Sequence, residues 1–393
     1  MAGLPTRIDG FAAQIAKLAQ CALGSILLLC AATSTNAMAD EWAVPQPAWE
    51  GVWAGTIGAM PVHVCLDKTP HQQKGAYYYD HVKRLLRLVP GETGGEWFEQ
   101  ETYDKNGARW HISPIGRSLT GTWRDGSTAL PIRLTRVGAA SREFAGPCGS
   151  MALHRPRLET VRLIARPGTM NGAAYSVLTF KPGPWANDEV EISTFSLNRP
   201  GSAASRINAL LRAALPKADG TGAWLDCIAA NVNWSGMDGT YFRTIAPTLI
   251  SERWLAVNEH GEYYCGGPHP ENENIPRTFD LQFGVEVNPL NWLGPNAVHR
   301  ENVGEGADGY KTLTPAFVAM ILKGWKAEDP AECDDAMRRQ DSWRIGVARG
   351  ALVFEPDFPR VILACGEDFR VPFSRLQPWL SNRGRIMVAT LPH

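Results

Sequence analysis

The chain has 393 residues, of which 44% are hydrophobic and 20% are charged, and its formal net charge is −1. This composition is typical of a folded globular protein with enough apolar side chains for a sizeable core. The near-neutral charge balance provides no overall attraction to nucleic acid or to an anionic membrane surface, so we expect neither as a partner.

The first segment, 1–39, has the pattern of an export signal. Basic residues precede an apolar run, 18–32, and small residues close the segment. The apolar run is shorter than the roughly 20 residues of a spanning helix, and no later segment approaches that length. We therefore predict a periplasmic or secreted mature chain without an integral membrane segment; the alternative is an uncleaved anchor. The predicted cleavage site comprises Ala37, Ala39 and Asp40.

Six cysteines remain after removal of this segment. An even number in an exported chain predicts disulfides, and six cysteines permit fifteen pairings. If the chain folds as consecutive units, pairing in chain order is favoured. No C-x-x-C or H-x-x-x-H spacing occurs, so we expect no metal site, and no nucleotide-binding motif indicates a cofactor. The six are Cys65, Cys148, Cys227, Cys265, Cys333 and Cys365.

Residues 40–150 are predicted to form an all-β domain. Between 49 and 137, about eight short segments alternate bulky and polar residues, with glycines between them. Strands at such regular spacing indicate an antiparallel meander that closes, or nearly closes, into a barrel or sandwich. No part of this region keeps a helical period for long.

The aromatic residues of this region have two interpretations. Flat rings on strands can stack on sugars, but alternate rings also fill the interior of a small barrel, and we favour the second. Tyr77 and Tyr79 share one face of a strand and are candidate binding residues, whereas Tyr78 points to the other face. The rings concerned are those of Trp53, Tyr77, Tyr79, Trp97, Trp110 and Trp123.

Residues 157–393 mix strand and helix periods, which predicts an α+β domain. Apolar residues at helical spacing predict a helix over 207–215, with Ser202 or Ser205 as its cap and Pro216 as its end. The other predicted helices are 314–326, 331–340 and 374–380. The predicted strands are 160–165, 174–180, 189–195, 248–257, 261–265, 278–283, 343–348, 351–354 and 360–364.

Two short motifs in this region resemble a known family. Tyr263-Tyr264-Cys265-Gly266-Gly267-Pro268-His269-Pro270 and Thr278-Phe279-Asp280-Leu281-Gln282-Phe283-Gly284 are similar to the Ser-Gly-Gly-Ala-His-Pro and Phe-Asp-Leu-x-x-Gly motifs of a secreted bacterial domain. This DUF3298-like domain occurs in lysozyme-sensing anti-sigma-factor ectodomains and in an accessory region of a peptidoglycan deacetylase. The resemblance covers about 157–384, with Cys265 where the family has serine and Pro268 where it has alanine. It implies an envelope recognition or accessory module.

The loop that carries the first motif supplies three candidate binding residues. Gly266 and Gly267 permit positive φ or close backbone approach, and the prolines hold His269 on a short turn. A single histidine in such a turn is more often a hydrogen-bonded structural residue than a catalyst. Glu271 and Glu273 are expected in a solvated loop.

An enzyme is the competing class, but the chain lacks the usual hydrolase motifs, and its cysteines are expected to be oxidised. A pair of carboxylates for glycoside cleavage could come from Asp280, Glu286, or Glu99 with Glu101. Glu99 and Glu101 share a strand face, which we expect to be a solvated stripe. We therefore predict a non-enzymatic module that binds peptidoglycan or a lysozyme-like protein, with a peptidoglycan hydrolase as the alternative.

Overall fold

The computed structural model of this protein describes residues 47–68, 73–102, 105–138, 146–158, 161–186, 188–300, 311–326 and 330–392. The predicted signal segment and its cleavage site lie outside these residues. Residues from Gln46 to the C-terminus form one compact unit. Within the described ranges, no helix combines the length and apolar character that a membrane span requires.

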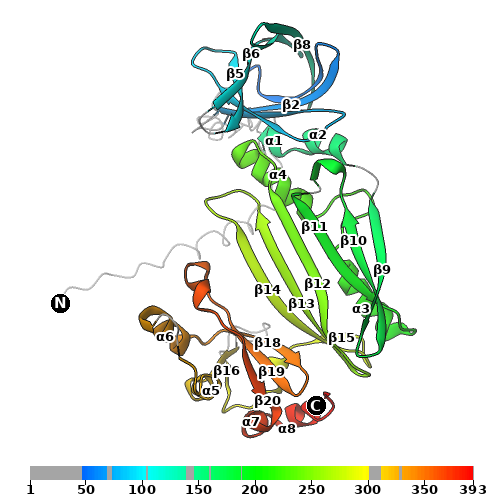
Figure 1. Cartoon of the computed structure of the whole chain (residues 1–393), viewed down its shortest axis with the longest axis vertical. Coiled ribbons are helices and arrows are strands. Elements are labelled where there is room, and N and C mark those ends of the chain that lie inside the picture. Colours follow the sequence, from blue (N-terminus) through cyan, green and yellow to red (C-terminus); the bar gives the residue numbers. More distant parts are fainter. Residues whose placement is uncertain are drawn as a thin grey trace, which may run out of the picture. The chain divides into compact units, whose positions relative to one another are not determined.

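Eight antiparallel strands form a closed barrel in which β8 pairs with β1 (Figure 1). Side chains alternate between its two faces, and the inward set is almost wholly apolar or aromatic, which explains the predicted two-residue period. The expected meander is thus a closed barrel. The strands are β1 Gly51–Ile57, β2 Met60–Lys68, β3 Gln73–Tyr79, β4 Leu86–Pro90, β5 Glu96–Thr102, β6 Lys105–Ile115, β7 Ser118–Asp125 and β8 Thr128–Gly138.

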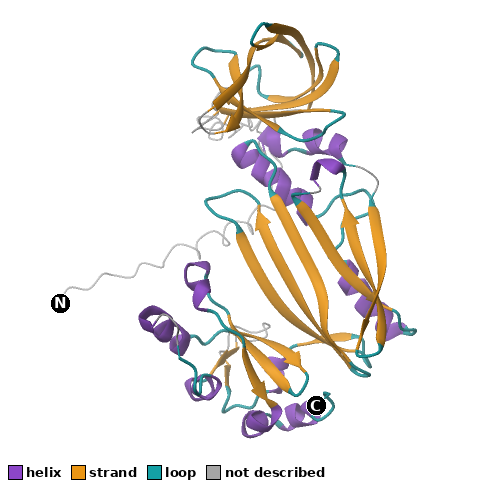
Figure 2. Cartoon of the chain, viewed as in Figure 1, coloured by secondary structure: helices purple, strands orange, loops and turns teal. Residues whose placement is uncertain are grey.

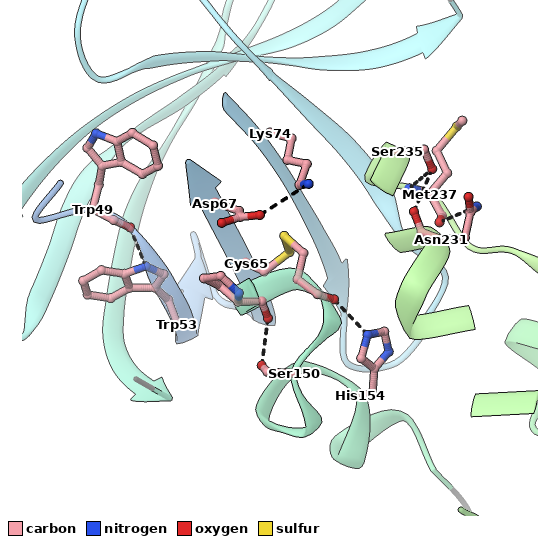
Figure 3. Close-up of a disulfide and its surroundings, with 12 residues drawn as sticks. Trp49, Trp53, Cys65, Asp67, Lys74, Ser150, His154, Asn231, Ser235 and Met237 are labelled. Atoms are coloured by element: carbon pink, nitrogen blue, oxygen red, sulfur yellow. Dashed lines mark hydrogen bonds and ion pairs between the residues drawn. A yellow bond between two sulfur atoms is a disulfide. The ribbon is translucent and has the colours of Figure 1, made fainter. Parts of the chain in front are cut away.

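The outer face of β1–β3 is also buried. Val52, Cys65, Ala76 and Tyr78 point out of the barrel and pack in one cluster with α1 (Gly146–Gly149), α2 (Met151–His154) and α4 (Ala223–Ser235). A disulfide from Cys65 to Cys148 joins β2 to α1 (Figure 3). At these four positions the outer face of the barrel is therefore buried and packed like its interior.

A fully buried cation lies beside this cluster. The Arg157 guanidinium donates to Asp238 at 2.7 Å and to the Lys83 carbonyl at 2.9 Å, and it stacks 3.7 Å from the centre of the Trp185 ring. A buried charge is tolerated only when it is paired and hydrogen-bonded, and both conditions are met here.

His154 is the titratable neighbour of this cation. Its ring is completely buried, and its Nε2 donates to the Cys148 carbonyl at 2.9 Å (Figure 3). Its Nδ1 lies 3.5 Å from Arg157 Nη1. Burial and then the positive charge of Arg157 lower the pKa of His154 to about 4. The imidazole is therefore neutral at physiological pH.

A seven-stranded sheet follows, in the order β15-β14-β13-β12-β11-β10-β9 (Figure 2). Its strands are antiparallel except for the parallel pair β11 and β12. Helix α3 (Ser202–Arg212) packs its apolar stripe on the sheet. The strands are β9 Arg162–Met170, β10 Ala173–Lys181, β11 Val190–Leu197, β12 Thr240–Ile250, β13 Trp254–Tyr264, β14 Glu271–Asp280 and β15 Val285–Val287.

The C-terminal part surrounds its own core, built on Trp254, Phe317 and Phe354. Its described residues contain a two-stranded and a three-stranded sheet with four α-helices around them. Its elements are β16 Val298–Arg300, β17 Lys311–Leu313, α5 Pro315–Ile321, α6 Pro330–Arg339, β18 Trp343–Ala348, β19 Ala351–Pro356, β20 Phe369–Pro372, α7 Phe373–Leu376 and α8 Asn382–Val388. The architecture agrees with the predicted combination of an all-β part and an α+β part.

The six cysteines pair in chain order. Besides Cys65–Cys148, the structure contains Cys227–Cys265, which joins α4 to the loop after β13, and Cys333–Cys365, which joins α6 to a 3₁₀ helix, Arg360–Cys365. These bonds fit a protein that works in an oxidising, extracytoplasmic compartment.

Several local predictions are wrong. The predicted strand 360–364 is the 3₁₀ helix, and the predicted strand 248–257 is broken by a turn, where Ser251 accepts from the Trp254 amide. Glu271 and Glu273 lie in β14 instead of a loop. Helix α3 begins after Gly201, whose φ of 108° ends the preceding segment, so neither serine caps it. The sequence also gave no indication of α4.

The buried imidazole predicts a defined pH dependence of stability. An unfolded histidine has a pKa of about 6.5, so between about pH 6.5 and 4 the unfolded chain binds a proton that folded His154 does not. The contribution of neutral His154 to the free energy of unfolding is fully present above pH 6.5. Acidification through this window should lower the free energy of unfolding by about 3 kcal/mol. Urea unfolding of wild type and His154→Gln at several pH values measures this term, which the variant should lack. His269→Gln, at an exposed histidine, is the control; an unchanged pH slope in His154→Gln would contradict the assignment.

Candidate functional site

A cleft of about 650 Å³ opens between the ends of β13 and β14 and the β18–β19 hairpin. Its volume is within the range of small-molecule sites, roughly 300–1,000 Å³. Four carboxylates and two guanidinium groups line it together with amides, imidazoles and apolar side chains. The charged groups are Glu271, Glu273, Glu355, Asp368, Arg344 and Arg360.

The cleft follows from the alternation of two strands. In β13 and β14, Asn258 and Asn274 point to the sheet face opposite the helix α3 core, which receives Val257 and Phe279. A smaller cavity of about 190 Å³ continues from the cleft and shares Asn274 and Glu355 with it. The two cavities thus form one groove along the sheet, lined by both polar and apolar side chains.

Gly346 in β18 sets the width of the groove at its narrow end. A Cβ at this position would lie 3.2 Å from the Pro276 side chain, so only a glycine lets the two sheets approach without displacement. Gly346 and Pro276 both line the smaller cavity.

Hydrogen bonds tie the two walls together. The Asn258 amide donates to Asn274 Oδ1 at 2.5 Å, and Asn274 Nδ2 donates to Glu355 Oε2 at 3.0 Å. Arg344 Nη1 donates to the Asn274 carbonyl at 2.6 Å. This chain runs from β13 through β14 to β19, so the polar groups are held in place before any ligand binds.

Glu355 has a perturbed acidity. Burial and then the negative charge of Asp368 raise its pKa, while Arg344 and the amide of Asn274 oppose the rise. A carboxyl group with a raised pKa in a cleft is a candidate proton donor, although ion-pair networks also shift pKa values. Among the described residues, no cluster of His, Cys, Asp and Glu could hold a metal ion.

The loop with the Gly-Gly-Pro-His motif lies at the edge of the cleft. Gly266 and Gly267 have φ values of 98° and 103°, and a Cβ on Gly266 would lie 2.9 Å from the Trp234 side chain. The disulfide of Cys265 fixes the start of the loop. His269 is exposed and lines the cleft, and its Nδ1 lies 3.3 Å from the Pro270 carbonyl. The two glycines therefore determine the backbone shape of the loop. The side chain of this loop that lines the cleft is the His269 imidazole.

The other candidate binding residues, Tyr77 and Tyr79, lie inside the barrel. Their rings form an edge-to-face pair with centroids 5.4 Å apart, next to Glu99. Glu99 does not lie on a solvated outer stripe as predicted, because the register of β5 turns it into the barrel, opposite Leu88. The side chain of Glu101 lies outside the described residues.

Asp280 and Glu286, the other carboxylates considered, are held in ion pairs. Asp280 accepts from Arg253 at 2.9 Å and caps the turn after β14, and Glu286 pairs with Arg277 at 2.7 Å. Sequence reasoning missed four groups that line the groove: Asn258, Asn274, Glu355 and Asp368. The alternation of Asn272 and Asn274 was the available signal, and it was hidden by the expectation of a loop.

No protein-family model matches the chain, and no curated protein matches it. Solved structures that are similar to it include the following two. A DUF3298 family protein from Pseudomonas aeruginosa has 12% identity and a TM-score of 0.31, over 58% of this chain and 96% of that protein. A DUF3298 family member from Bacteroides fragilis has 9% identity and a TM-score of 0.37, over 59% and 97%. The similarity is to the family that the sequence motifs indicated.

The acidity of Glu355 can be tested through its neighbours. Asp368→Asn removes a like charge and should lower the pKa of Glu355, whereas Arg344→Gln removes an opposing positive charge and should raise it. Carboxyl-carbon NMR titration measures both changes. Asp335→Asn, at an acid paired with Arg339 on α6, is the control and should leave the titration of Glu355 unchanged. Titration of Glu355 that is insensitive to Asp368 would contradict the coupling.

Proposed function

We propose that this protein is an exported cell-envelope module that recognises cell-wall glycan in the cleft between β14 and β19. The observation that carries the proposal is an open, preorganised groove of ligand size lined by amide and carboxylate groups. Sugar hydroxyls both donate and accept hydrogen bonds, and this lining offers both functions. Phe358, Leu363 and Pro356 add apolar surface for the faces of sugar rings.

Export supports the cell wall as the place of action. The three disulfides fit an oxidising compartment, and the signal pattern of 1–39 supplies the route. We propose that the exported chain consists of the barrel domain, 40–150, and the DUF3298-like domain, 157–393, with the groove in the second.

A lysozyme-like protein is the second ligand that the cleft could recognise. Carboxylates outnumber guanidinium groups in the lining, which favours a basic partner, and the Gly-Gly-Pro-His motif resembles a domain of lysozyme-sensing proteins. Such a contact would weaken with salt more than a glycan complex held by neutral hydrogen bonds.

For the hydrolase alternative, Glu355 and Asp368 are the candidate catalytic carboxylates. Glu355 and Asp368 line the same groove, and the raised pKa of Glu355 suits a general acid. Turnover of wall fragments that is lost in Glu355→Gln would favour this alternative over recognition, whereas saturable binding without turnover supports the module proposed here.

Titration of the oxidised mature protein with soluble peptidoglycan fragments and with lysozyme, at low and at physiological salt, tests the binding proposal. We expect saturable binding of the glycan at both salt concentrations. Asn274→Ala removes the central amide of the groove and should weaken binding about tenfold, the equivalent of one or two hydrogen bonds.

The matched control is Asn296→Ala, since Asn296 is an exposed asparagine that donates only to the Pro378 carbonyl, outside the groove. This variant should bind like wild type. If neither ligand binds, or if both asparagine variants bind alike, the groove is not the recognition site.

The export proposal has its own test. Expression of the full-length chain in a Gram-negative host should place it in the periplasm with Asp40 as the first residue, as read by N-terminal sequencing. Replacing Ala39 with a bulky residue, Ala39→Leu, should block cleavage and leave the chain attached to the membrane. A cytoplasmic product with an intact N-terminus would overturn the proposal.

A further inference from the structure

One carboxylate inside the barrel has no role in the groove. Glu99 follows Trp97 by two residues in β5 and therefore shares its inward face, whereas Phe98 points outward beneath the Arg109 guanidinium. Trp97 is 2% exposed, and Glu99 is only half-buried. The carboxylate thus lies between the packed interior and the solvent.

Three donors converge on a single oxygen of this carboxylate. Glu99 Oε1 accepts from the Tyr77 hydroxyl at 2.6 Å, from Trp123 Nε1 at 2.7 Å and from Trp110 Nε1 at 3.1 Å. These donors come from β3, β7 and β6, so the carboxylate is fixed from three sides. Among the described residues, the donors that reach this carboxylate all bind Oε1.

The charge of Glu99 is not neutralised by its partners. Hydroxyl and indole donors are neutral, and in the described part of the barrel the ion pairs involve other acids, such as Asp67 with Lys74 and Glu96 with Arg109. A neutral amide would satisfy the same donors. A carboxylate here therefore adds a negative charge that the packing of the barrel does not require.

Aromatic rings surround the charged group. Tyr77 and Trp110 are 1% exposed and pack edge to face with centroids 4.8 Å apart, forming the floor. Tyr79 and Trp123 are only partly buried and lie toward the end of the barrel, near the ends of β3 and β7. A carboxylate fixed beside partly buried aromatic rings is an environment in which an organic cation can be stabilised by the carboxylate and by the rings.

We propose that this end of the barrel binds an ammonium group, with Glu99 Oε2 as counter-ion and the rings of Tyr79 and Trp123 as walls. An anionic ligand would be repelled by the carboxylate. A neutral ligand would leave the charge uncompensated and less hydrated than before. A cation gains both the carboxylate and the negative faces of the rings. The proposal concerns a site separate from the groove and does not depend on its ligand.

The probes are tetramethylammonium and n-butylammonium chloride, with tert-butanol as the neutral match and sodium chloride holding ionic strength constant. Binding is followed through the indole NMR signals of Trp110 and Trp123. We expect saturable shifts with at least one cation and none with tert-butanol. The two cations distinguish a quaternary from a primary ammonium ligand.

Glu99→Gln keeps an acceptor for the three donors and removes the charge, so it should fold and bind the cation at least tenfold more weakly. Should it fail to fold, Trp123→Phe, which replaces the indole by a weaker ring and removes its Nε1 donor to Glu99, provides the second test and should also reduce affinity. Glu191→Gln, at an exposed acid in β11, and Asn274→Ala, in the groove, are the controls and should bind normally.

Three results would overturn the proposal. The first is an equal response to the cations and to tert-butanol, and the second is unchanged cation affinity in folded Glu99→Gln. The third is saturable binding of a neutral disaccharide, with no binding of either cation, which would make the site a sugar site.

Discussion

The burial of the outer face of β1–β3 is the constraint on which the arrangement of this molecule depends. A small closed barrel normally needs apolar side chains only inside, but here Val52, Ala76 and Tyr78 are also removed from water by α1, α2 and α4. Because α4 also carries Cys227 and packs on the central sheet, the same cluster connects the barrel to the element that anchors the motif loop. The barrel is therefore packed on α4, and α4 is covalently joined to the motif loop by the Cys227–Cys265 disulfide.

The buried ion pair of Arg157 and Asp238, which lies beside this apolar cluster, stabilises the fold in a different way. Arg157 is completely buried, so its separation from Asp238 would leave an unpaired charge in an apolar environment. The apolar cluster favours many similar packings, whereas the ion pair is satisfied in one geometry only. Apolar burial thus stabilises the packing of the barrel on the helices, and the ion pair selects one geometry for it. The neutral ring of His154 is a further neighbour of Arg157.

Where local periodicity determines structure, the sequence was sufficient. The barrel strands and helix α3 have clear periods of two and 3.6 residues, because each has one buried face. Helix α4 was missed because Trp224, Leu225 and Cys227 are buried on different sides of it, which erases the polar stripe. The run Val361-Ile362-Leu363 was taken for a strand, but Val361 is 90% exposed in a 3₁₀ helix that the Cys365 disulfide holds.

The groove and the barrel carboxylate were less accessible to sequence reasoning for a different reason. Alternation shows that Glu99 and Trp97 share a face, but only pairing with β4 and β6 decides that this face is the interior. Asn274 and Glu355 are 81 residues apart and meet only because β14 and β19 belong to facing sheets. Such contacts depend on tertiary arrangement and leave no local pattern.

The chain-ordered disulfides have a consequence for how the protein is made. Their loops, with sequence separations of 83, 38 and 32 residues, neither overlap nor enclose one another. In an oxidising compartment that receives the chain N-terminus first, each cysteine meets its native partner before the next pair emerges. The simplest oxidation, between successive cysteines, then gives the native pairs, so an exported chain would depend less on an enzyme that reshuffles mispaired bonds.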